Sequence, residues 1–199
     1  MSLRVIDGPA PIAVPADIPG DHDPADTRVA ALNAGVQAVI EGPTGWLRRS
    51  LGEQTIALSV PSWQRAIGLP CGPVVVIDSV AYRDRLGEEQ TVDQSVYRCS
   101  DNRCLFGTGF SFPAVECADD AITVTYKAGY DAQKVPANAK QAVIIGVLHL
   151  KSLGDQSLFL REEDVEGVGS TVYTVSEAAT AVVKAATDML LQPLKVRSL

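Results

Sequence analysis

Histidine and cysteine, the residues that most often carry acid–base catalysis and bind metals, are scarce in this sequence. It has two histidines, His22 and His149, and none of its four cysteines forms a Cys-x-x-Cys pair. His149 lies inside an apolar segment, where a structural role is more common than a catalytic one. The sequence also lacks the Gly-x-Ser-x-Gly, His-Glu-x-x-His, P-loop and dinucleotide-binding motifs. We therefore expect no enzymatic activity, no cofactor and no bound metal.

Aromatic residues make up only 6% of the chain, which leaves few rings on which a sugar could stack. A hydrolase that uses carboxylates alone stays open as an alternative, and a close, buried pair of acids in a cleft would favour it. The pair Asp119-Asp120 precedes a predicted strand and has turn-like surroundings. The acidic run at 162–166 lacks the alternating ligand positions of a calcium loop, so we interpret it as a solvated charge run.

Long apolar runs and basic runs are both missing. The stretch Ala142–Leu150 is too short to cross a bilayer, and the first residues contain prolines and an early Asp7 in place of an apolar signal sequence. The formal net charge of −7 disfavours direct binding to nucleic acid. We expect a soluble protein made in the cytoplasm, with free thiols. Cys99 and Cys104 nevertheless flank a predicted hairpin tip, where a disulfide is geometrically conceivable.

The first forty residues combine an extended arm with a helix. Four prolines within residues 1–22 predict an arm that lies along a sheet, along a neighbouring subunit or in solution. From Pro24 to Glu41 apolar residues recur at helical spacing. Asp23 is the predicted N-cap of this helix, and Gly42 ends it.

From Leu47 to Tyr126 the hydrophobic period changes to two. The predicted strands are QTIALSV, PVVVIDSVAYRD, QSVYRCS, CLFGTGFSF and AITVTYKAG. Short polar turns join them, and DRLGEEQ is a predicted hairpin loop with Gly87 at its tip. Successive strands with short connections indicate an antiparallel sheet or a small sandwich.

Two further helices follow. Pro136 starts one that runs to about Gly154 and is apolar nearly all round, so this chain or another subunit must bury it. Residues 155–175 are predicted to be a long loop that is flexible or ordered by a partner. Ser176 is the predicted N-cap of the last helix, which stops before Pro193.

Five segments, taken in order, carry a resemblance to a known family. They are SLRVIDGPAPIAVP, ADTRVAALNAGVQAVIEGPTGWLRR, GLPCGPVVVIDSVAYRD, ITVTYKAGYDAQKVPANAKQAVIIGVLHL and DMLLQPLKV. Each is a structural motif, and their order and spacing make the match specific. Together they resemble the head-tail connector, or adaptor, proteins of long-tailed phages and gene transfer agents, above all the phage φE125 gp8-like and HK97 gp6-like connectors.

The resemblance implies an α+β fold, in which a small helical bundle carries an antiparallel β domain inserted between its first and second helices. The implied boundaries are an extended arm over 1–22, the first helix over 23–46, the β domain over 47–130, and the other helices with the C-terminal tail over 131–199.

The resemblance also implies a structural role. Such proteins form a ring of about twelve copies on the portal protein, join the capsid to the tail and form part of the DNA exit channel. The implied partners are the portal, a stopper or tail-terminator protein, other copies of the chain, and DNA that passes without specific binding. The expected location is the neck of a virion or phage-like particle made in the bacterial cytoplasm, away from any membrane.

Two sets of residues are predicted to mediate assembly. In the second helix, apolar side chains share a face with lysines, which suggests a subunit interface at Ile144, Leu148 and Lys151. Burial of that face under the segment after Gly154 explains the pattern equally well. The C-terminal residues predicted to bind the portal are Leu191, Leu194, Val196 and Arg197.

A different class of function stays open. The chain could be a monomeric, β-rich binding module that recognises a peptide or a carbohydrate. A stable monomer with a concave pocket and no association with a portal would favour this alternative.

Overall fold

The computed structural model describes residues 1–155, 162–165, 169–172 and 177–196 and divides into two compact units. The first unit contains residues 1–10, 40–135 and Val196, and the second contains residues 11–39 and 136–195. Each unit is therefore built from segments that are distant in sequence. Helices and antiparallel sheets occur together, which confirms the α+β fold class.

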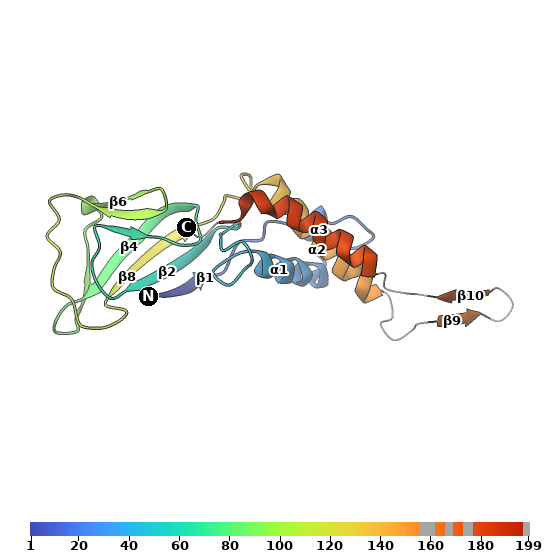
Figure 1. The fold of residues 1–199 in the computed structure, drawn as a ribbon, viewed down its shortest axis with the longest axis horizontal. Helices are drawn as coiled ribbons and strands as arrows, with labels where there is room; N and C mark the ends of the chain where they lie inside the picture. The colour runs from blue at the N-terminus through green and yellow to red at the C-terminus, as the bar shows by residue number, and fades with distance from the viewer. Residues whose placement is uncertain (156–161, 166–168, 173–176, 197–199) are drawn as a thin grey trace. The chain divides into compact units, whose positions relative to one another are not determined.

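A five-stranded antiparallel sheet forms the centre of the first unit (Figure 1). Its spatial order is β1 (Ser2–Asp7), β2 (Gln54–Val60), β8 (Ile122–Ala128), β4 (Val74–Arg83) and β5 (Glu89–Thr91). The predicted strands β2, β4 and β8 are confirmed. The beginning of the N-terminal arm lies along this sheet as its edge strand β1, one of the alternatives left open by the sequence.

The alternating pattern of the central strands decides which face of the sheet is buried. Every second residue of β8, from Ile122 to Ala128, is buried. Ile56 and Leu58 of β2 pair with Tyr126 and Val124 of β8, and all four side chains are fully buried. The hairpin between β4 and β5 turns at Gly87, whose positive φ of 81° suits glycine. The predicted hairpin loop is therefore confirmed.

A three-stranded antiparallel sheet shares the core of the first unit. Its order is β3 (Ala66–Gly68), β7 (Arg103–Phe106) and β6 (Tyr97–Ser100). Ile67, Cys104 and Phe106 belong to the same buried cluster as the apolar residues of β2, β4 and β8. Trp63 packs at its margin against Tyr82, with ring centroids 5.4 Å apart. The two sheets thus form a small sandwich, one of the two arrangements that the sequence left open.

Two predicted strands of this region are shorter than expected. The segment QSVYRCS begins with the 3-10 helix η2 (Gln94–Val96) before β6. The segment CLFGTGFSF leaves the sheet after Phe106, because the Gly107 N–H donates to the Val96 carbonyl and the Phe110 N–H donates to the Gly107 carbonyl. A turn therefore replaces the second half of that strand.

The second unit is built on the helices α1 (Thr27–Ile40), α2 (Ala137–Asp155) and α3 (Glu177–Leu191). Figure 1 shows α3 alongside α2, and the Asn138 side chain of α2 donates to the Leu190 carbonyl of α3 at 2.8 Å. A methyl group at Gly146 would lie 2.8 Å from Val36 Cγ1, so α1 and α2 also approach closely. No described helix is long and apolar enough to cross a membrane.

The helix ends match the predictions except at the start of α1. Asp26, not Asp23, is its cap, because its Oδ1 accepts from the Arg28 and Val29 N–H groups at 2.8 and 3.2 Å. Asp23 instead closes a local turn with the Ala25 N–H. The 3-10 helices η1 (Pro15–Asp17) and η3 (Gln192–Leu194) precede α1 and follow α3. The predicted cap Ser176 lies outside the described residues.

The segment between α2 and α3 differs from the predicted loop. It contains the strands β9 (Glu162–Val165) and β10 (Gly169–Val172), which pair with each other antiparallel. The prediction of a long loop, flexible or ordered by a partner, over 155–175 is therefore wrong for 162–165 and 169–172, which are strands. A ladder of backbone hydrogen bonds needs no apolar side chains, so the acidic run gave no strand signal.

Candidate functional surfaces

The second half of the N-terminal arm is fastened to α1. Ile12, Ala13 and Ile18 are buried, and the Ile12 N–H donates to the Gln37 Oε1 atom at 3.0 Å. The Asn33 side-chain amide donates to the Ala13 carbonyl at 3.3 Å. These buried amide side chains supply the arm with hydrogen-bond partners where the sheet no longer does. This second half of the arm, residues 11–22, is thus a structural part of the second unit.

The arm also reaches the two lysines of α2. Lys140 Nζ lies 2.8 Å from Asp17 Oδ1, and Lys151 Nζ lies 3.2 Å from His22 Nδ1. His22 Nε2 lies 2.8 Å from the Pro15 carbonyl oxygen, an acceptor, so Nε2 carries the proton and Nδ1 accepts from Lys151. Burial alone raises the pKa of Asp17, but the hydrogen bonds from Lys140 and the Val14 N–H outweigh it and lower that pKa.

These contacts bear on the predicted subunit interface of α2. Ile144 and Leu148 are half-buried, and Lys151 is half-buried with its ammonium group on His22. The side of α2 that faces the core is made of Ala142, Val143 and Val147, which are fully buried. The structure thus brings the three predicted residues onto the partly exposed side of α2, and a role in an interface stays a prediction.

The predicted portal-binding residues fall into different environments. Leu191 is buried at the end of α3, Leu194 is half-buried in η3, and Val196 is 48% exposed. The Val196 N–H points to the Leu47 carbonyl at 3.5 Å. Arg197 lies outside the described residues. Of the described C-terminal residues predicted to bind the portal, Val196 is the most accessible.

A buried carboxylate organises the connection between α1 and β2. Glu41 is 3% exposed, and its Oε2 atom accepts hydrogen bonds from the Leu51 N–H and, at 2.9 Å, from the Gly52 N–H. Gly42, with φ of 83°, turns the chain directly after Glu41. Sequence reasoning missed this role, because a glutamate at a helix end is ordinarily a solvated residue.

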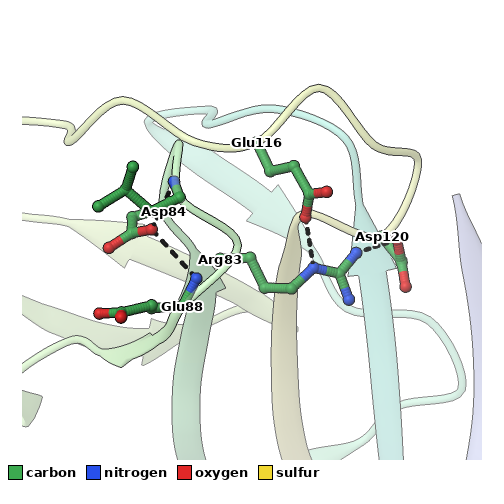
Figure 2. Close-up of polar contacts among 6 residues, drawn as sticks. Arg83, Asp84, Glu88, Glu116 and Asp120 are labelled. Carbon is green, nitrogen blue, oxygen red and sulfur yellow. Dashed lines mark hydrogen bonds and ion pairs between the residues drawn. The ribbon is translucent and has the colours of Figure 1, made fainter.

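Arg83 at the end of β4 joins three segments of the first unit (Figure 2). Its Nε lies 2.7 Å from Glu116 Oε2 and its NH2 group lies 2.5 Å from Asp120 Oδ1. Asp84 accepts from the backbone N–H groups of Leu86 and Glu88 and so shapes the adjoining hairpin. These contacts hold the end of β4, its hairpin and the segment from Glu116 to Asp120 together, and we call this group of side chains the Arg83 corner.

The acids of this corner do not form the buried pair expected of a hydrolase. Asp119 and Asp120 are both exposed. The hydrogen bond from Arg83 lowers the pKa of Asp120, and the Leu86 N–H lowers the pKa of Asp84. A general acid needs a raised pKa, so neither group is suited to that role. The described residues also contain no group of three or more metal-binding side chains.

The four cysteines are thiols in the structure. Cys99 and Cys104 are paired neighbours on β6 and β7, as expected for residues that flank a hairpin tip. Burial raises the pKa of Cys104 to about 12 and that of Cys71 to about 11, so neither thiol is a nucleophile at neutral pH.

The outer face of the three-stranded sheet carries a groove of about 490 Å³. Leu105 and Ala66 lie on its floor, opposite in register to one another, and Arg65 and Arg98 border it. Neither arginine forms an ion pair with a described residue. Sequence reasoning missed this basic surface, because its arginines come from different segments and form no run.

The fold resembles chains of gene transfer agent particles. One solved structure is a virion of a native particle, with 18% identity and a TM-score of 0.62, and two are particle necks computed with C6 and C12 symmetry, each with 17% identity and TM-scores of 0.64 and 0.62. Each match covers 100% of this chain and 98% of the other. No family model and no curated protein matches the chain. The chain therefore has the complete fold of these particle chains.

Proposed function

We propose that this chain is a connector protein in the neck of a gene transfer agent or tailed phage, where it forms a ring on the portal and joins the capsid to the tail. The observation that carries this proposal is the agreement of the fold over the full length of both chains. A partial match would cover a common sandwich or a pair of helices. A full-length match includes both units and the order in which the chain passes between them.

The proposed mechanism is assembly. A closed ring requires that each copy present one surface to the copy before it and a different surface to the copy after it. The symmetry of the neck structures that resemble this chain supports such an arrangement. The portal would bind one side of the ring, and a stopper or tail-terminator protein would bind the other. The net charge of −7 would keep passing DNA from adhering to the channel.

The groove on the three-stranded sheet favours a second candidate. Its apolar floor and its two arginines, which form no ion pair with any described residue, suit an extended peptide that carries both apolar and acidic side chains. A monomeric peptide-binding module is therefore the competing function. The two candidates differ in what they predict for the mass of the protein in solution.

Light scattering on the purified protein, alone and mixed with the portal protein from the same gene cluster, tests the proposal. We expect a large complex of fixed stoichiometry with the portal, whether the free chain is a monomer or a ring. Val196→Asp should weaken the complex, because Val196 is 48% exposed in the tail. The control Leu86→Asp, at an 86% exposed hairpin position, should not. A folded monomer that never joins the portal at any salt concentration would favour the binding module.

A further inference from the structure

Among the residues that the structure describes, no strand pairs with two edges of the five-stranded sheet. β1 pairs only with β2, so its outer edge faces away from the sheet. β5 covers the outer edge of β4 only from Ala81 to Arg83. The beginning of β4, Val74–Ile77, therefore forms a second open edge, on the opposite side of the same sheet.

Both open edges expose apolar side chains. Val5 and Ile6 of β1 are 37% and 47% exposed, and Val75 and Val76 of β4 are 58% and 45% exposed. Exposed edges in soluble proteins are ordinarily protected by charges, prolines or an irregular backbone. Here bulges occur near both edges, but no charged side chain lies within Val74–Ile77. The β4 edge is therefore suited to contact another strand, and on β1 the apolar pair Val5–Ile6 lies between the charged residues Arg4 and Asp7.

The neighbouring groups of β4 are already occupied and mark the limits of its open edge. The Val74 N–H donates to Asn102 Oδ1 at 2.8 Å. At the other end, the Gln94 side chain donates to the Asp78 carbonyl at 2.9 Å. Between these two contacts only Val75, Val76 and Ile77 are open to a partner strand, about 10 Å of chain.

The apolar segments of the two edges, in β1 and at the beginning of β4, lie at the same height along the strand direction, so the same rows of paired residues connect them. Along one row of paired residues, Val5 of β1 is followed by Ile56, Tyr126 and Ile77 of β4. Along the next row, Asp7 is followed by Thr55, Lys127 and Val76. A second copy that continues this register would thus bring its Val5–Asp7 opposite Val75–Ile77. Its Ser2 would fall opposite Ala81, which already pairs with Thr91 of β5, so only Val5–Asp7 could join the sheet and the residues before it would have to turn away.

The strand directions fit the same placement. Four neighbouring strands of the sheet, β1, β2, β8 and β4, alternate strictly in direction, because each adjacent pair is antiparallel. A copy that repeats the sheet in the same orientation therefore places its β1 antiparallel to β4. Antiparallel pairing is the more stable of the two arrangements. The contact also joins two different edges, as a ring requires.

We propose that neighbouring copies in the ring are joined edge to edge, with β1 of one copy added to the Val75–Ile77 edge of β4 in the next. This inference rests on the proposed function, because it specifies the contact between copies of that ring. The short length of the open edge makes each contact weak in isolation. The ring then depends on many such contacts formed together.

Disulfide cross-linking tests the contact on the portal-bound ring. In a Cys99→Ser/Cys117→Ser background, which removes the exposed native thiols, the double variant Asp7→Cys/Val76→Cys is assembled on the portal and treated with copper phenanthroline. The oxidant removes two electrons and two protons from each pair of facing thiols. We expect a ladder of covalent multimers up to the full ring on a non-reducing gel.

The single variants Asp7→Cys and Val76→Cys are the matched controls. Each alone should give no cross-link, and an equimolar mixture of the two should give dimers only. A ring that forms on the portal without a ladder would overturn the edge contact and leave the proposed function standing. Dimers from a single variant would show that two β1 edges, or two β4 edges, face each other. That result would also overturn the proposed contact between β1 and β4. If no ring forms with unmodified protein, the proposed function fails and the contact with it.

Discussion

The buried carboxylate of Glu41 offers the sharpest test of how the connection between α1 and β2 is held. Replacing Glu41 with alanine would leave the Leu51 and Gly52 N–H groups without their acceptor. A buried donor left unpaired costs about 1–3 kcal/mol, so two donors cost about 2–6 kcal/mol of the free energy of unfolding. Glu41→Gln keeps one oxygen that can accept from both groups, but it removes the charge and replaces the other carboxylate oxygen with an NH2 donor, so its cost should be about 1–2 kcal/mol.

Urea unfolding followed by tryptophan fluorescence measures this difference. Trp46 and Trp63, the two tryptophans of the chain, both belong to the first unit, which contains Glu41. The midpoint should fall in the order wild type, Glu41→Gln, Glu41→Ala, with an unchanged m-value. Glu53→Ala is the control, because the Glu53 side chain is exposed and its carbonyl bond to the Ala10 N–H is unaffected. A loss below about 1 kcal/mol for Glu41→Ala would refute the reasoning.

Two further predictions concern the N-terminal arm. Gly52→Ala should destabilise the protein by about 1–3 kcal/mol, because the added methyl group would overlap the Ala10 carbonyl oxygen, whereas Gly8→Ala, with open space around it, should change the unfolding midpoint little. The folded-state pKa of Asp17 is lowered, so its ion pair with Lys140 stabilises the arm above the unfolded pKa and is lost as pH falls through the folded pKa. Hydrogen exchange of the arm amides should show this loss in the wild type and not in Asp17→Asn, and identical profiles would contradict it. The expected size is about 0.2–1 kcal/mol, because the pair is partly exposed to solvent.

Helix α1 shows how local periodicity can miss part of a buried face. The pattern put Val29, Leu32, Val36 and Val39 or Ile40 on the apolar side. In the structure Val29 and Ile40 are buried as the pattern predicts, and Val39, the alternative to Ile40, is 72% exposed. The buried face also contains Asn33 and Gln37, which are 2% exposed and which the pattern did not include. The reason is that the extended arm packs on α1 and brings backbone groups that need partners. Amide side chains satisfy those groups, and no rule of hydrophobic spacing registers that need.

The strands and the candidate surfaces also differ in how far the sequence alone predicts them. The strands with strict alternation, such as β2 and β8, were predictable because the sheet is buried on one face. The arginine-bordered groove was not, because Arg65 and Arg98 are brought together by the pairing of β3, β7 and β6. The open edge of β4 was equally invisible, since it depends on β5 ending where it does.

By itself the sequence determined the fold class, the central strands and most helix ends, because periodicity, prolines and glycines act over a few residues. Only the tertiary structure decided that the arm divides between the sheet and the helices, that Glu41 is buried, and that two apolar edges lie at one level of the sheet. These features arise from contacts between residues far apart in the chain. Their free energies depend on which backbone groups remain unpaired after packing, and no local pattern records that.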